Sequence, residues 1–209
     1  MAAADALLSD TRGALDPANA AARSMASSPA FEELYDQHVD LVWRALRRFG
    51  VAESAIEDAT QEVFLVAFRR LSSFEGKSTL STWLYGICAH VARNARRTER
   101  RHPETPTEDV GHDQASTSAT PEQVASEREA QRILYELLDA LDHDKREAFV
   151  LAELEGLSAP EIAASLGLNV NTVYARIRAG RAAFDDALRV RQARERRPPT
   201  KKKGAFPWR

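Results

Sequence analysis

The chain has 209 residues, of which 44% are hydrophobic and 29% charged, and its formal net charge is −2. This length allows one or two domains of ordinary size, and the scarcity of glycine favours helices. The single cysteine, Cys88, excludes an internal disulfide, and the scattered histidines exclude a structural zinc site; no apolar run approaches the length of a membrane span.

The first part of the chain is predicted to be an arm followed by three helices. Residues 1–29 are rich in alanine, serine and aspartate and are interpreted as a flexible arm. Apolar residues at helical spacing then predict helices over 31–49, about 54–71 and about 79–101. Cys88 lies in the apolar pattern of the third helix, where a small core residue is expected.

Local signals predict where these helices begin and end. Gly50 is expected to end the first helix, and Ser54 with Glu57 has the spacing of a capping box that would open the second. The end of the third helix is strongly basic. No alternation typical of β-strands appears in the sequence, so we expect an all-α protein.

An acidic segment separates the first helices from a second helical block. Residues 102–120 combine prolines, serines, threonines and acids, a composition typical of a flexible linker. Thr120, Pro121 and Gln123 then predict the start of a helix that runs to about Leu141. Asp142 is expected to cap the next helix, which stops at Gly156.

The stretch "GLSAPEIAASLGLNVNTVYARIRAGRAAF", residues 156–184, contains two short helical patterns. Ser158 and Glu161 form a capping box, and Gly167 is a natural C-terminal cap. The second helix opens at Asn169 or Asn171 and carries several arginines around an apolar stripe. This pattern indicates a helix-turn-helix whose second helix enters a major groove. The alternative is an ordinary helical hairpin whose arginines face solvent.

The charge is unevenly distributed along the chain. Residues 189–209 carry nine basic residues and one acid, whereas residues 102–129 carry seven acids and one arginine. The overall charge therefore hides a basic C-terminal tail. This tail is interpreted as a nonspecific phosphate binder, a partner contact or a disordered end.

Taken together, the two blocks resemble the bacterial RNA polymerase sigma factors of the extracytoplasmic-function (ECF) group. The resemblance rests on "DATQEVFLVAFRRL" and "STWLYGICAHVARNARR" in the first block, and on "LDALDHDKREAFVLAELEGLSAPEIAASLGLNVNTVYARIRAGR" in the second. It implies two small helical domains, of sigma-two and sigma-four type, joined by the acidic linker. The implied ranges are 1–29 for the arm, 30–101 for sigma-two, 102–120 for the linker, 121–188 for sigma-four and 189–209 for the tail.

The resemblance implies a polymerase-binding patch on the second helix. In the family, residues at the positions of Asp58, Gln61 and Glu62 bind the clamp coiled coil of the largest polymerase subunit. Their spacing places them together as an exposed polar patch opposite Val63 and Phe64. Without the rest of the pattern, a solvated helix face would explain them as well.

The loop "SSFEGKST" and the helix after it resemble the part of sigma-two that opens the minus-ten element. Opening requires a base to leave the stack, and stacking and hydrogen bonds suit exposed bases. For Trp83, a place in the hydrophobic core is the alternative. Three arginines are expected to hold phosphates. The residues implied for this surface are Phe74, Lys77, Ser78, Thr79, Trp83, His90, Asn94, Arg93, Arg96 and Arg97.

The recognition helix should read the minus-thirty-five element as a duplex. Asn171 and Thr172, near its start, are expected to contact phosphates. Tyr174, Arg178 and Ala179 fall where many relatives make base contacts, although many relatives carry arginine at the position of Tyr174. Arg176 and Arg181 are interpreted as contacts to the DNA backbone or as internal ion pairs.

The resulting functional prediction is a sigma factor rather than an enzyme. It would bind core RNA polymerase and promoter DNA, be held by an anti-sigma factor, and act in the cytoplasm or, within holoenzyme, at the nucleoid. No cofactor, metal, small-molecule substrate or membrane insertion is expected. Two alternatives remain: a helix-turn-helix regulator that binds an operator by itself, and a protein that only docks on polymerase or another regulator.

Overall fold

The computed structural model describes residues 29–101 and 120–196. The chain divides into two compact units, Met1–Val39 and Asp40–Arg209, and both predicted helical blocks from Asp40 onward belong to the second. Every regular element in the described ranges is helical, which confirms the predicted all-α class. The described elements are α2 (Pro29–Arg48), η1 (Glu53–Ala55), α3 (Ile56–Arg70), η2 (Leu71–Ser73), α4 (Leu80–Arg101), α5 (Pro121–Asp139), α6 (His143–Phe149), η3 (Val150–Leu154), α7 (Ala159–Leu166) and α8 (Val170–Arg196).

Helices α3 and α4 pack against each other around apolar residues that recur at helical spacing. Gly50 ends α2 with a φ of 85°, a conformation that favours glycine, as expected from the sequence. The buried apolar side chains from Asp40 to the end of α4 include Val42, Leu46, Phe49, Val63, Phe64, Leu84, Ile87, Cys88 and Val91. Cys88 is therefore a core residue, and burial raises the pKa of its thiol.

The predicted capping box of Ser54 and Glu57 is wrong. A 3-10 turn, η1, contains Ser54, and α3 begins only at Ile56 with Ala55 at the cap position and no side-chain hydrogen bond to the helix end. The signal failed because the chain turns around Ser54 before the helix starts. One residue, Ala55, lies between the predicted cap and the first helical residue, Ile56.

In the second block, the Thr120 capping box is confirmed. The Thr120 amide donates to Oε1 of Gln123 at 2.9 Å, and the Gln123 amide donates to Oγ1 of Thr120 at 3.3 Å. Asp142 occupies the cap position of α6, but its carboxylate accepts from Nζ of Lys145 at 2.5 Å instead of capping the helix. The chain then continues through a π-helical turn, η3, which the sequence analysis did not predict.

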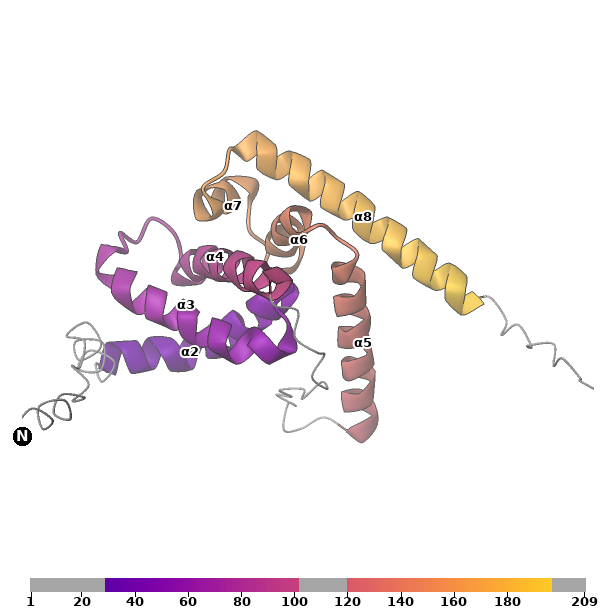
Figure 1. The fold of residues 1–209 in the computed structure, drawn as a ribbon, viewed down its shortest axis with the longest axis horizontal. Coiled ribbons are helices and arrows are strands. Elements are labelled where there is room, and N and C mark those ends of the chain that lie inside the picture. The colour runs from indigo at the N-terminus through magenta and orange to yellow at the C-terminus, as the bar shows by residue number, and fades with distance from the viewer. Residues whose placement is uncertain (1–28, 102–119, 197–209) are drawn as a thin grey trace, which may run out of the picture. The chain divides into compact units, whose positions relative to one another are not determined.

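The helix-turn-helix forms as predicted from α7 and α8. The Glu161 carboxylate accepts from the amide and the hydroxyl of Ser158, and Gly167 turns the chain with a φ of 66°. Asn169 Oδ1 accepts from the Asn171 amide at 2.9 Å, so Asn169 rather than Asn171 caps α8. Helix α8 is one continuous helix that extends to Arg196 (Figure 1), past residue 189, where the basic tail was expected to begin.

Helix α8 crosses α6 closely at a glycine. Gly180 is buried, and a Cβ there would lie 2.9 Å from Cβ of Phe149 and 3.0 Å from the carbonyl oxygen of Lys145. One helical turn further along, Phe184 stacks on Phe149 with ring centroids 4.9 Å apart. These contacts fix the direction of helix α8 relative to α6.

Three expected segments lie outside the described residues: the arm through residue 28, the linker from 102 to 119 and the tail from 197 to 209. Within the described ranges, no helix has both the length and the apolar character needed to cross a membrane. The same ranges hold no cluster of three or more histidine, cysteine or acidic residues arranged to bind a metal ion.

Candidate functional site

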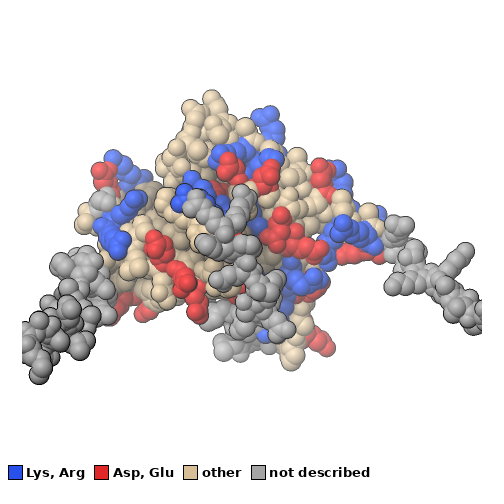
Figure 2. Space-filling view, in the orientation of Figure 1, with Lys and Arg blue, Asp and Glu red and all other residues tan. Residues whose placement is uncertain are grey.

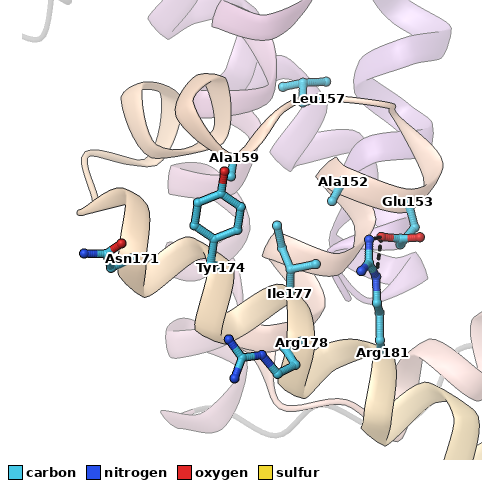
Figure 3. A pocket seen from close by; sticks show the side chains of 9 residues that line it. All are labelled: Ala152, Glu153, Leu157, Ala159, Asn171, Tyr174, Ile177, Arg178 and Arg181. Atoms are coloured by element: carbon cyan, nitrogen blue, oxygen red, sulfur yellow. Dashed lines mark hydrogen bonds and ion pairs between the residues drawn. The ribbon is translucent and has the colours of Figure 1, made fainter.

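The start of α8 presents an open surface with a shallow pocket of about 600 Å³. Figure 3 shows Tyr174, Asn171 and Arg178 projecting from the helix around this pocket, with Ala159 of α7 behind Tyr174. Tyr174 is 53% exposed, although it is a large aromatic side chain. Arg178 is also exposed, and no described carboxylate forms a salt bridge with it. These two side chains are therefore available to a ligand at this surface.

The other two arginines of this helix are held by carboxylates. Arg176 pairs with Asp144 of α6 at 2.5 Å, and Arg181 pairs with Glu153 of η3 at 2.6 Å, as Figure 3 shows for the latter. Both arginines thus form internal ion pairs in this structure, which is one of the two interpretations given for them, and their contact with the DNA backbone stays a prediction. Such pairs are partly exposed and contribute little to stability, so they position the guanidinium groups more than they hold the fold.

Asn171 and Thr172 lie exposed in the first turn of α8. The backbone amide of Asn171 donates to the side chain of Asn169. The side chains of Asn171 and Thr172 are exposed. The first turn of a long helix favours an anion because its amides point outward. The position fits the predicted phosphate contacts, and the side-chain amide supplies a donor.

A second group of predicted residues lies at the start of α4 and in the loop before it. The ring centroids of Phe74 and Trp83 are 5.3 Å apart, and the ring planes are tilted by 47°. Phe74, in the loop, therefore packs against Trp83. Thr79 Oγ1 accepts from the Thr82 amide at 3.1 Å, which makes Thr79 the cap of α4. Lys77, paired with Glu75, and Ser78 are exposed beside it.

Further along α4, the predicted residues divide into exposed and buried ones. His90 and Asn94 are exposed, with the Asn94 amide nitrogen 3.3 Å from Nε2 of His90. Arg97 is exposed as well. Arg96 is only 6% exposed, and it donates to the carbonyl oxygen of Phe49 and to the Glu147 carboxylate. In this arrangement Arg96 is not available to a phosphate.

The predicted polymerase patch lies on α3. Asp58, Gln61 and Glu62 are all exposed, whereas Val63 and Phe64 are buried. Leu65, one turn from Gln61, is 44% exposed and adds an apolar element that the sequence analysis did not single out. An acidic patch with an exposed leucine suits a partner that offers both cations and an apolar contact.

Charge on the displayed face is mixed rather than segregated. In Figure 2, lysine and arginine side chains lie beside aspartate and glutamate side chains, without one continuous basic field. The ion pairs of α8 show the same mixing of charge, because Arg176, Arg181 and Arg191 are each held to a carboxylate.

Several residues of consequence were missed from the sequence. Arg146 and Glu147 of α6 are 4% and 1% exposed, and burial lowers the pKa of the Arg146 guanidinium and raises that of the Glu147 carboxyl. "HDKREAF" has the composition of a solvated helix, so no local signal could have found them. A long-range pairing of charges is needed to explain their burial.

The chain is similar to known proteins over both helical blocks. It matches the families described as "Sigma-70 region 2" over residues 34–102 and "Sigma-70, region 4" over residues 131–184. The ECF RNA polymerase sigma-E factor of Escherichia coli is 35% identical over 147 residues, which cover 66% of this chain and 76% of that protein. The ECF RNA polymerase sigma factor SigE of Mycolicibacterium smegmatis is 35% identical over 164 residues, 78% of this chain but only 63% of the relative.

Two solved structures have a similar fold. CnrH, solved in complex with the cytosolic domain of CnrY, has a TM-score of 0.56 and 28% identity, covering 81% of this chain and 95% of that one. The sigma factor RpoE, solved with the anti-sigma factor NepR from Bartonella quintana, has a TM-score of 0.58 and 22% identity, covering 78% and 99%. At that identity the second likeness concerns the fold alone.

Proposed function

Because the chain belongs to the ECF RNA polymerase sigma factors, we propose that it binds core RNA polymerase and directs the initiation of transcription at a specific set of promoters. The observation that carries this proposal is the presence of both sigma regions in one chain, in order. An exposed acidic patch on α3 and an exposed recognition surface on α8 support it. A regulator that binds an operator alone has no use for the first region.

In the proposed function, each of the two regions makes different contacts with polymerase or promoter DNA. Asp58, Gln61 and Glu62 hold the polymerase clamp. The loop before α4 and the exposed face of α4 bind the separated minus-ten strand, with Trp83 and its neighbours offering stacking and hydrogen bonds. Helix α8 reads the minus-thirty-five duplex through Tyr174 and Arg178, with Asn171 and Thr172 on the backbone. The chemistry of RNA synthesis belongs to polymerase.

We also infer a protein inhibitor of the anti-sigma type and a cytoplasmic location, at the nucleoid within holoenzyme. The solved complex of CnrH with the cytosolic domain of CnrY supports this inference by its similarity. An inhibitor encoded beside this gene is expected to compete with core polymerase for the purified chain. Simultaneous binding of both would contradict that role.

The experiment that tests the proposed function reverses one charge in the polymerase patch. Glu62→Lys is expected to weaken holoenzyme assembly by at least about tenfold, because each lost contact to a charged group is worth about 1.5–3 kcal/mol. Because Glu62 is exposed, the melting curve is expected to stay unchanged. Glu127→Lys on the exposed side of α5 is the matched control with the same change of charge. Core binding is measured by titration of labelled chain.

Normal core binding by Glu62→Lys would reject the patch. Transcription from a responsive promoter completes the test, because a sigma factor yields open complexes only together with polymerase. A chain that binds its promoter alone and gives no polymerase-dependent opening would instead be an operator-binding regulator. A chain that does neither would be a docking protein.

A further inference from the structure

Two carboxylates that lie outside α8 hold two of its arginines. Arg176 donates to Asp144 of α6 at 2.5 Å, and Arg181 donates to Glu153 of η3 at 2.8 Å. All four side chains are partly accessible to solvent, with exposed fractions of 24% and 60% in the first pair and of 60% and 33% in the second. Figure 3 shows the second pair at the rim of the pocket on α8. Because both pairs are accessible, each arginine can exchange its carboxylate for an anion from solution.

The two paired arginines lie on opposite flanks of the buried stripe of α8. An α-helix turns by about 100° per residue, so side chains five residues apart point about 140° away from each other. The buried residues Val173 and Ile177 lie between these two directions. The exposed face of the helix, which carries Asn171, is therefore bordered by one paired cation on each side.

This placement suits contact with both strands of a DNA duplex. A helix in the major groove has a sugar-phosphate strand along each edge of the groove. Cations on the two flanks of the helix therefore face one strand each. A guanidinium binds a phosphate as it binds a carboxylate, through charge-assisted hydrogen bonds that are frequently bidentate. The carboxylates of Asp144 and Glu153 thus hold the guanidinium groups that DNA phosphates would otherwise bind.

Other contacts already fix α8 on the domain. Gly180 permits a close approach to α6, and Phe184 stacks on Phe149. Partly exposed ion pairs add little to stability, because solvent and salt screen the charges and the long side chains lose entropy when they are ordered. The two ion pairs therefore matter more for what the arginines can bind than for how the helix is held.

We propose that Asp144 and Glu153 are positioning residues that compete with DNA phosphates for the two arginines and so limit the affinity for DNA of any sequence. Each backbone contact by these arginines then requires a carboxylate to be displaced, whatever bases lie beneath. Selection among sequences is left to Tyr174 and Arg178, which are exposed on the same helix. This inference rests on the proposed function, in which α8 enters a major groove.

The test measures how tightly the full chain, without polymerase, binds a short random-sequence duplex. Asp144→Asn and Glu153→Gln each remove one negative charge and keep the size of the side chain. Each variant is expected to bind about threefold tighter, and the double variant about tenfold tighter, because an exposed ion pair of this kind is worth about that factor. The slope of log affinity against log salt concentration should steepen by up to about 0.9 for each released arginine. Circular dichroism and melting curves should match those of the parent chain.

Two variants control for the charge and for the shape of the side chain. Glu136→Gln removes the same charge from a carboxylate that pairs with Arg191, also on α8. Arg191 lies about 22 Å further along the helix than Arg176, more than the roughly 10 Å over which charges interact at about 0.1 M salt. This control should change the affinity less than twofold. Asp144→Glu keeps the carboxylate and should bind the duplex like the parent chain.

A third control shows whether the carboxylate acts through the arginine. In an Arg176→Ala background, Asp144→Asn should change the affinity less than twofold, because no guanidinium remains to be released. An equal gain with and without Arg176 would reveal general repulsion between Asp144 and DNA and would overturn the inference. A folded double variant that binds the random duplex within twofold of the parent chain would overturn it as well.

Promoters separate this inference from failure of the proposed function. Together with core polymerase, the double variant should gain by a similar factor on promoters that differ only in the upstream element, because phosphate contacts carry no sequence information. A gain confined to one upstream element would overturn the inference. If the parent chain directs no promoter-dependent transcription, the proposed function fails. The random-duplex measurement then still decides the competition, because it contains no polymerase.

Discussion

Single side chains on α8 divide into those that carboxylates hold and those that remain exposed. Arg176 and Arg181 belong to the first kind, and Arg178 and Tyr174 to the second. A guanidinium that is already paired reaches DNA only by giving up its carboxylate. An exposed one is free to form the two parallel hydrogen bonds that identify guanine.

Arg178→Ala is therefore expected to weaken transcription in a way that depends on the upstream sequence. Losing one good base contact costs about 1–3 kcal/mol, roughly tenfold to hundredfold, and only promoters with the preferred base lose it. Arg176→Ala should act nearly equally on all promoters and reduce the salt dependence if the residue holds phosphate. Transcription from a small set of upstream variants at two salt concentrations measures both.

A uniform loss with Arg178→Ala would reassign this residue to the DNA backbone. No loss in either variant would remove α8 from the role of reader. Because Arg176 is bound to Asp144, an Asp144→Ala variant is a useful companion. This variant removes the carboxylate that holds Arg176 and leaves the Arg176 guanidinium in place.

At the scale of elements, the caps of α5 and α7 stabilise helix ends through neighbouring residues. The α6–α8 crossing instead joins residues that are far apart in the sequence. The Ser158 amide and hydroxyl both donate to the Glu161 carboxylate. These hydrogen bonds lower the pKa of the Glu161 carboxyl. The helix-turn-helix is thus stabilised at its entry by an ionised side chain.

This cap predicts a pH-dependent difference in stability. Because the folded-state pKa of Glu161 is depressed, its contribution is present at neutral pH and is lost as pH falls from about 4.5 through the lowered folded value. Glu161→Gln cannot ionise, so the parent chain is expected to be more stable at pH 7 and the difference should vanish in acid. Chemical denaturation across pH 3–7 measures it.

Glu122→Gln is the control, because Glu122 lies in the first turn of α5 but is not the residue that completes the Thr120 box. It should show a smaller change with pH. An equal pH dependence in both variants would mean that the helix dipole, not the cap, is responsible.

Gly180→Ala is expected to destabilise the chain despite the preference of helices for alanine. Alanine gains about 1 kcal/mol over glycine in an open helix. The added methyl group, however, would lie 2.9 Å from Cβ of Phe149. Crowding a packed contact costs about 1–3 kcal/mol, so we expect a net loss of up to about 2 kcal/mol.

Denaturant midpoints measure the effect of Gly180→Ala. Ala182→Gly, at an exposed position of the same helix, gives the intrinsic difference between the two residues in α8. A stabilising Gly180→Ala would show that α6 and α8 do not cross this closely in solution.

At the scale of the whole molecule, the proposed minus-ten surface and the contact with the second region share helix α4. Trp83 lies partly buried against Phe74, and Asn94 is exposed beside His90. The Phe74–Trp83 pair packs within the loop region, and in the proposed function it also offers an aromatic surface to bases. Its function and its packing must therefore be separated by experiment.

Replacing Trp83 and Asn94 by alanine is expected to spare polymerase binding and slow strand opening, because these side chains act only on separated strands. Each lost stacking contact is worth about 1–3 kcal/mol. A promoter with a pre-opened bubble should restore transcription. Unfolding of both variants would instead place these residues in the core.

Local signals in the sequence were enough to predict the helices, the two regions and the helix-turn-helix. Ser158, Glu161 and Gly167 act within one turn of chain, so their effect can be read from neighbouring residues. The exposure of Asp58, Gln61 and Glu62 follows from helical periodicity alone. Ser54 shows the limit of such signals, because a 3-10 turn placed the helix start two residues later.

Tertiary structure alone decided which charges are free. Arg96 and Glu147 are 51 residues apart, and nothing near either predicts that they meet in a buried pair. The same holds for Arg146 at the end of α2 and for Gly86 against Ser165. Burial of a charge depends on which helices pack together, and that choice is made by apolar surfaces and close approaches spread over the whole chain.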